Sequence, residues 1–500
     1  MRLRAATLLA FLCLGSVAQA DPAAAVVAAL ADAQRLAPDA AKYARYLSLY
    51  AIEEKHRREF LGVQAYQVNS ISREAELVTP RQAAADLTAI DIRDYNLDSA
   101  TWEKLAVIDP YFHVPAVEED EYEDYGNYWL RGQVVPKGTA GAEWKTSEKR
   151  RTGKKIKKQG AASPWLPTKE IKELIERTGS AAPIVRADWF FVQTARQLSL
   201  RNKQTGVGYY DWLKLKDRGD LFKLIKFSEK DSIEIQQEIR AALDRSGVSQ
   251  QNRQIVAFRA LTGRIWITLD VKDEADKGNA IRNLKRGDFQ HDAEEIYAVG
   301  RNGLPVYFLS DDKGVRQDSA PDFIGGDDSA GRVGRDARIH VSLACIRCHG
   351  GDVLQPINDW ARRTYTNGLV IQSPDYDVLK ELRRQYLSNL DGALAQDRAA
   401  FRDAIRQASG LEAGKLSVAY GEAWNRYAEQ SVTLEVAAFE LGCPPEKLMQ
   451  SLKGILTTTG QLDPVLAVFT KTPPGTIQRV HWEEVYSLAQ TNMRGLAVQP

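Results

Sequence analysis

The sequence predicts an α+β fold, with a helical N-terminal region, an antiparallel β region in the middle of the chain and a helical C-terminal region. Apolar residues recur at helical spacing near the N-terminus, as in Val26, Leu30, Ala33 and Leu36, and again near the C-terminus. Between them, β-branched and aromatic runs of strand length follow one another. Asn302-Gly303 separates two of these runs, which favours an antiparallel hairpin or meander.

The chain has 500 residues, which suggests roughly two to four domains at about 100–200 residues each. We expect a signal peptide over residues 1–20 and a mainly helical region with charged loops over residues 21–180. An α+β region with antiparallel strands is expected over residues 181–335, and a second helical region over residues 336–500.

The first 20 residues have the pattern of a secretory signal peptide. Arg2 and Arg4 precede an apolar run over residues 5–14, and small residues end at Ala20, where we expect cleavage. The apolar run is shorter than the about 20 residues that a spanning helix needs; the alternative is an uncleaved signal anchor. No later segment is apolar over such a length, so we expect a periplasmic protein with no transmembrane span after cleavage.

The balance of charge points to neither nucleic acid nor an anionic membrane as a partner. The chain has 67 Lys and Arg and 66 Asp and Glu, a formal net charge of +1, and cleavage after Ala20 would make it −1 by removing two arginines. Charge is concentrated in the acidic run Glu118–Asp124 and the basic run Lys149–Lys158. Each run is most simply a solvated loop; the alternative is a docking patch for a redox partner.

In chain order, the pattern predicts helix from Asp21 to about Tyr66, a strand over Leu87–Ile92, and a helix with Ser99 as its N-cap. Two further helices are expected over Thr168–Arg177 and Ile233–Leu243.

Four strand-like runs follow: Ile255–Phe258, Ile265–Leu269, Ile296–Val299 and Val306–Leu309. Residues 319–336 are rich in Asp, Gly and Ser and predict a loop. Helical patterns then return over Tyr376–Leu387, Asp397–Ala408 and Leu434–Leu441.

The residues Cys345-Ile346-Arg347-Cys348-His349 form a C-x-x-C-H motif, which is typical of c-type haem attachment. Thiols three residues apart face the same side of one helical turn, where each can form a thioether with a haem vinyl group, and His349 then presents its imidazole to the iron. We therefore expect one covalent haem c, attached after export by the cytochrome c maturation machinery. The alternatives are a C-x-x-C disulfide, which would want a βαβ context, and half of a zinc site, which would need a second ligand pair.

Cleavage of the signal also removes Cys13, leaving only Cys443 besides the two motif cysteines. Three cysteines cannot supply a disulfide framework for so long a chain. Cys443 is expected to be a small buried apolar side chain at a helix end.

The second axial ligand of the iron is left open. A Met or second His there favours electron transfer, whereas an open position favours the binding or activation of small molecules. The candidates are Met449, for which a core side chain is the better interpretation, and His340, five residues before Cys345, for which a local structural role is as good an interpretation. His291, among acidic residues, is expected to have a surface hydrogen-bonding role.

The chain resembles a group of large bacterial cytochrome c domain proteins with one C-x-x-C-H motif. The matching stretches are Ile90–Tyr95, Trp102–Leu105, Arg186–Phe190, Ser246–Ser249 with Asn252-Arg253, Asn302–Leu304 before the turn Asp311–Gly314, and Leu434–Leu441. The resemblance implies haem attachment at Cys345, Cys348 and His349, and no particular activity. The basic run Lys149–Lys158 departs from the group. Simple cytochromes c have a helix before the motif, whereas here a sheet and a loop precede it.

These features predict an exported monohaem c-type cytochrome that transfers electrons through its haem to a periplasmic redox partner protein. One alternative is a haem oxidoreductase or peroxidase-like enzyme with an open distal iron site. Another is a haem-based sensor or interaction protein. Both stay open because most of the chain is not needed to wrap one haem.

Overall fold

The computed structural model describes residues 22–112 and 168–495, apart from short gaps within the second range. The gaps are residues 198, 201–202, 205, 235–237, 246–248, 250, 322, 325–338, 350, 355–356, 358 and 363–375. The expected signal peptide, both charged runs and most of the expected loop over residues 319–336 lie outside the described residues. No described helix is both long enough and apolar enough to cross a membrane.

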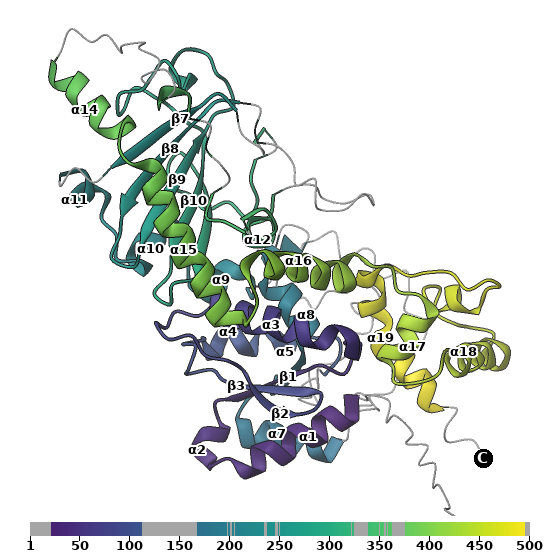
Figure 1. The fold of residues 1–500 in the computed structure, drawn as a ribbon. Helices are drawn as coiled ribbons and strands as arrows, with labels where there is room; N and C mark the ends of the chain where they lie inside the picture. Colours follow the sequence, from purple (N-terminus) through teal and green to yellow (C-terminus); the bar gives the residue numbers. More distant parts are fainter. Residues whose placement is uncertain are drawn as a thin grey trace, which may run out of the picture.

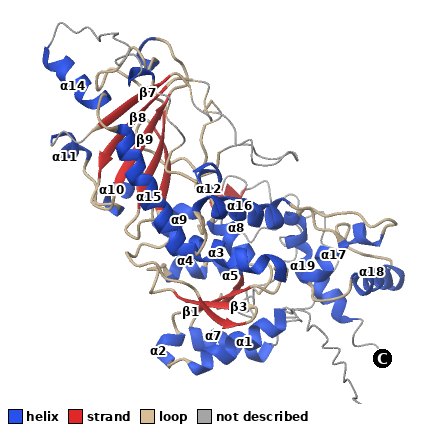
Figure 2. Cartoon of the chain, in the orientation of Figure 1, coloured by secondary structure: helices blue, strands red, loops and turns tan. Residues whose placement is uncertain are grey.

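The described chain has a mixed α+β architecture, with a small sheet near the N-terminus, a larger sheet in mid-chain and helices at the C-terminus (Figure 1, Figure 2). The helices up to mid-chain are α1 (Pro22–Arg35), α2 (Pro38–Ala41), α3 (Glu54–Ser70), α4 (Ser99–Glu103), α5 (Leu105–Ile108), α7 (Thr168–Thr178), α8 (Ala187–Thr194), α9 (Tyr209–Leu213), α10 (Arg218–Leu224), α11 (Glu229–Glu234) and the short η3 (Asp276–Gly278).

The N-terminal region is built around a four-stranded mixed sheet in the order β2-β3-β1-β4. Its strands are β1 (Ala44–Ser48), β2 (Arg81–Ala84), β3 (Leu87–Asp91) and β4 (Ile184–Arg186). Figure 1 shows α1 and α7 on one side of this sheet and α3 and α8 on the other. The prediction of continuous helix from Asp21 to Tyr66 is therefore wrong over β1. Every residue of β1 is buried, so the strand lacks the alternation that would have distinguished it from helix.

The start of α4 also differs slightly from the prediction. Asp98, rather than Ser99, caps this helix, because its carboxylate accepts a hydrogen bond from the Thr101 backbone N–H at 2.8 Å. The predicted strand over Leu87–Ile92 is confirmed as β3.

The middle of the chain forms a five-stranded antiparallel meander in the order β11-β10-β9-β8-β7. Its strands are β7 (Ile239–Leu243), β8 (Arg253–Arg259), β9 (Arg264–Asp270), β10 (Ala293–Val299) and β11 (Pro305–Asp311). All four predicted strand runs are confirmed. The predicted helix over Ile233–Leu243 is wrong over β7, which pairs along its whole length with β8, although its first two residues lie in α11. A two-residue ladder joins β5 (Ser199–Leu200) to β6 (Lys203–Gln204).

Helix α15 (Leu390–Ser409) covers one face of the meander (Figure 1). Asp397 on this helix accepts hydrogen bonds from Trp266 Nε1 and Arg264 Nη1, both at 2.8 Å. The opposite face packs against aromatic residues from the preceding segment, with the Tyr210 ring centroid 5.2 Å from that of Phe308.

The C-terminal part is helical, as predicted. Its elements are α12 (Leu343–His349), α14 (Tyr376–Tyr386), α15, α16 (Ala413–Trp424), the π-helical turn η4 (Asn425–Glu429), α17 (Leu434–Glu440), α18 (Pro445–Thr459), the 3-10 turn η5 (Leu466–Thr470) and α19 (Arg479–Gly495). One continuous cluster of buried apolar side chains includes residues of the N-terminal region, the meander and the C-terminal helices.

Candidate haem-attachment site

Helix α12 carries the whole C-x-x-C-H motif and ends at His349. Leu343, Ala344 and Ile346 are buried and anchor the helix in the core. Helix α16 packs alongside, where the Ser417 hydroxyl donates a hydrogen bond to the Arg347 carbonyl oxygen at 3.1 Å. The motif therefore lies on a helix whose orientation is fixed by packing rather than on an unsupported loop.

The two motif thiols lie on one turn of α12 but differ in exposure. Cys345 is half-buried and packs against the main core, whereas Cys348 is exposed. Burial raises the pKa of the Cys345 thiol above its ordinary value, and the nearby Glu295 carboxylate adds to the effect. None of the three cysteines that the structure describes forms a disulfide.

His349 is half-buried at the end of α12, and its ring faces Tyr307 of β11 with the two ring centroids 6.0 Å apart. Burial lowers the pKa of this imidazole, which Glu295 partly opposes, so the neutral form is favoured. His349 Nδ1 is buried and has no hydrogen-bond partner among the residues that the structure describes. A neutral imidazole with an unengaged ring nitrogen retains the lone pair that a metal requires.

Buried tyrosines gather around the Cys345 thiol and lie within its electrostatic reach: Tyr66, Tyr209, Tyr210, Tyr307 and Tyr420. Burial raises the pKa of each phenol, so all five are neutral at physiological pH. The Tyr307 hydroxyl has no hydrogen-bond partner in the described part of the chain. Sequence reasoning missed this cluster, because its members come from α3, α9, β11 and α16 and share no local pattern.

The two proposed distal ligands lie in different places. His340 is half-buried and pairs with Ser319 in an isolated β-bridge just before α12. Met449 lies on α18 and packs against the core, and Figure 1 draws α18 far to the right of α12. His340 therefore lies directly before the motif helix, whereas Met449 lies on a helix far from it.

The prediction for Cys443 is confirmed, and the prediction for His291 is confirmed in part. Cys443 is 7% exposed, just beyond α17, and burial raises its pKa to about 11, as expected of a small core side chain. His291 has a hydrogen-bonding role, with Nε2 3.1 Å from Glu294 Oε1, although its side chain is only 20% exposed.

The donor set on α12 fits a haem c. Two thiols on one turn would carry the thioether bonds, and the adjacent imidazole, with a nitrogen left unengaged, would bind the iron. Within the described residues, no group of three or more His, Cys, Asp and Glu side chains is arranged to hold a metal ion by itself.

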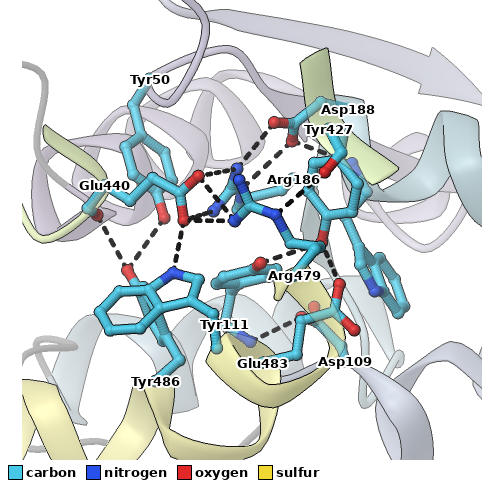
Figure 3. A network of polar contacts seen from close by, with 12 residues as sticks. Tyr50, Asp109, Tyr111, Arg186, Asp188, Tyr427, Glu440, Arg479, Glu483 and Tyr486 are labelled. Carbon is cyan, nitrogen blue, oxygen red and sulfur yellow. Dashed lines mark hydrogen bonds and ion pairs between the residues drawn. The ribbon is translucent and has the colours of Figure 1, made fainter. Parts of the chain in front are cut away.

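A second polar cluster lies deep in the protein, where the N-terminal region meets α17 and α19 (Figure 3). Glu440 of α17 lies at its centre, 3.1 Å from Arg186 Nη1 and 2.8 Å from Arg479 Nη1. Asp188 accepts two further hydrogen bonds from Arg186, at 2.7 and 3.1 Å. Both guanidinium groups are buried, so each positive charge is compensated by carboxylates rather than by water.

Tyrosines and two more acids complete this cluster. Tyr427, in the π-helical turn η4, donates a hydrogen bond to Glu483 at 2.5 Å, and its hydroxyl lies 2.9 Å from that of Tyr111. Asp109 accepts a hydrogen bond from the Tyr111 backbone N–H at 2.8 Å. Burial raises the pKa of both Asp109 and Glu483 to about 7.

The fold and the motif together describe a mixed α+β protein with a helix-borne C-x-x-C-H site. Comparisons with family models, with curated proteins and with solved structures found no match for this chain.

Proposed function

We propose that the chain is an exported c-type cytochrome with one haem, held through thioether bonds at Cys345 and Cys348 and ligated by His349. The observation that carries the proposal is that α12 presents all three side chains on adjoining turns, with His349 Nδ1 unengaged by any described residue. Membership of the group of large bacterial cytochrome c domain proteins is part of this proposal.

The haem would supply one-electron chemistry, and the protein would set its potential through the axial ligands and through burial. Electron transfer to a periplasmic partner protein is the function we favour. Export through the signal peptide and haem attachment by the cytochrome c maturation machinery belong to the same proposal. The buried aromatic and apolar surroundings of Cys345 support it, because a low-polarity environment limits the access of water to the iron.

Mass spectrometry of the denatured protein tests haem attachment directly. The chain is produced in a periplasm with active cytochrome c maturation, and the wild type is expected to gain the mass of one haem. Replacing both motif cysteines, Cys345→Ala with Cys348→Ala, is expected to abolish the gain. Cys443→Ala, which removes the third cysteine, is the matched control and is expected to retain it. A wild-type mass without haem would overturn the proposal.

Optical and EPR spectra of the haem-loaded protein test whether it is an electron carrier or a haem enzyme. Low-spin iron that does not bind cyanide or carbon monoxide is expected of a carrier with two protein ligands. High-spin iron that binds them would favour a haem enzyme instead. Loss of the low-spin signal in His340→Ala, but not in Met449→Ala, would assign His340 as the second ligand.

A further inference from the structure

Asp270 is a buried acid at the end of β9 that no part of the haem motif explains. The residue is 1% exposed and forms an ion pair with Arg253, which is also buried. Apart from this ion pair, neither Asp270 carboxylate oxygen has a hydrogen-bond partner among the described residues. Buried polar atoms with so few partners are rare in folded proteins and often mark functional positions.

The strand register places this pair on the face of the meander that α12 approaches. Asp270 lies opposite Arg253 of β8 and Ala293 of β10. Two residues further along β10 is Glu295, whose carboxylate lies 3.6 Å from Arg253 Nη1. Tyr307, the ring that faces His349, shares this face because it pairs with Tyr297.

The cluster is within electrostatic reach of the proposed iron ligand. Both Glu295 and Arg253 act on the His349 imidazole, the first raising and the second lowering its pKa. A change of charge at the iron would therefore be felt by Arg253 and by the acid paired with it, because Coulomb interactions weaken slowly in a buried environment.

The charges that face Asp270 leave its ionised form only partly compensated. Burial is the largest effect on its pKa, and Arg253 from β8 opposes it; Glu295 from β10 raises the pKa further, while His291, before β10, lowers it. The net result is a pKa of about 7. Burial is the main physical reason, and one guanidinium shared between two carboxylates compensates it only in part.

We propose that Asp270 binds a proton when the haem iron is ferrous and releases it when the iron is oxidised. The inference rests on the proposed function. If the haem were oxidised, one electron would pass to a one-electron acceptor, and the added positive charge would stabilise the Asp270 carboxylate. The carboxyl O–H bond then breaks and the proton passes to solvent. Reduction reverses both transfers, so that one proton accompanies one electron.

Redox titration of the haem-loaded protein at a series of pH values tests the inference, with ferricyanide and mediators as electron acceptors. Across the pH range in which only the ferrous form holds the proton, the midpoint potential is expected to fall by 59 mV per pH unit, a tenfold change in the equilibrium constant per unit. Asp270→Asn, which cannot ionise, is expected to remove this dependence. His291→Gln is the control and is expected to keep it. A dependence that persists in Asp270→Asn, or disappears in His291→Gln, overturns the inference.

Glu295→Gln provides a second test if Asp270→Asn does not fold. Because the Glu295 carboxylate raises the pKa of Asp270, its removal is expected to move the pH-dependent range to lower pH. If the pH range of this dependence does not move, Asp270 is not the group that exchanges the proton. A protein without covalent haem refutes the proposed function, whereas a haem-loaded protein with a pH-independent potential refutes only this inference.

Discussion

Arg186 and Glu440 are 254 residues apart in the chain, yet the Arg186 guanidinium lies 3.1 Å from the Glu440 carboxylate. The contact joins the end of β4 to α17 and so links the N-terminal region to the C-terminal helices (Figure 3). Although burial acts to raise it, Arg186 and Arg479 hold the pKa of Glu440 at about 2. Glu440 is therefore ionised throughout the physiological range and balances two buried cations.

Replacing Glu440 by Gln is expected to destabilise the protein strongly. The change leaves two buried guanidinium groups without their shared carboxylate, and breaking a buried ion pair from one side costs about 3–5 kcal/mol. Unfolding in guanidinium chloride measures the loss. The control is Glu422→Gln on α16, where a half-exposed pair with Arg426 at 3.2 Å contributes no more than about 1 kcal/mol. Equal effects of the two changes would contradict the assigned role of Glu440.

Stability is expected to fall as the pH rises from about 4 to about 7, because Asp109 and Glu483 must ionise in a buried site. Their folded pKa values of about 7 lie above the ordinary values of 3.8 and 4.5, so folding favours the protonated forms. The stabilisation is complete below the ordinary values and is lost as the pH rises through about 7. Each carboxyl contributes at most about 1.4 kcal/mol per pH unit.

Denaturant unfolding at several pH values measures this trend. The double variant Asp109→Asn with Glu483→Gln mimics the protonated state and is expected to show a shallower dependence. Part of the slope is expected to remain, because Asp270 is also a buried acid with a raised pKa. An unchanged slope in the double variant would show that neither carboxyl is protonated in the folded protein.

Sequence patterns predicted the parts of the fold that carry a local signature. Four strands of the meander, β8 to β11, were recognisable because each is a β-branched or aromatic run beside turn residues. Strands β1 and β7 were mistaken for helix, because both are short and almost wholly buried and therefore lack an alternating pattern. For such runs, the pairing partners decide the structure, and the nearer partner of β1 in the chain, β3, is about 40 residues away.

The candidate site likewise contains residues that a local motif predicts and residues that only the tertiary structure brings together. Five consecutive residues suffice to predict haem attachment, because the chemistry depends on spacing within one helical turn. Tyr307, Arg253 and Asp270 escaped prediction, since only the register of the four strands β8 to β11 places them on one face of the meander. No local sequence pattern predicts that register.

Asp397 is expected to hold α15 on the meander. In Asp397→Ala, the buried Trp266 Nε1 loses its only hydrogen-bond acceptor in the described structure, and the cost of such an unsatisfied donor is about 1–3 kcal/mol. Asp397→Asn keeps an acceptor oxygen and is expected to recover part of the loss. Chemical unfolding, followed by tryptophan fluorescence, measures the free energy of unfolding of both variants. Asp403→Ala, on the same helix but in a half-exposed pair with Arg406, is the control, and a loss as large there would count against a specific role for Asp397.

The close approach of α3 to the end of α15 makes Gly62 sensitive to substitution. A Cβ atom at Gly62 would lie 2.8 Å from the Ser409 carbonyl oxygen and 2.7 Å from Leu411 Cδ1. Since the first of these is backbone, the helices must separate to admit the methyl group, at an expected cost of about 1–3 kcal/mol. This exceeds the gain of up to about 1 kcal/mol that alanine brings to a helix.

Gly414→Ala is the matched control, because a Cβ atom at Gly414, near the start of α16, would meet nothing within 4 Å. It is expected to leave stability unchanged or to raise it by up to about 1 kcal/mol. Thermal unfolding of the two variants separates the two effects, since the backbone propensity gain is common to both and the clash belongs to Gly62 alone. If Gly62→Ala were as stable as Gly414→Ala, α3 and α15 could not be packed as closely as the structure shows.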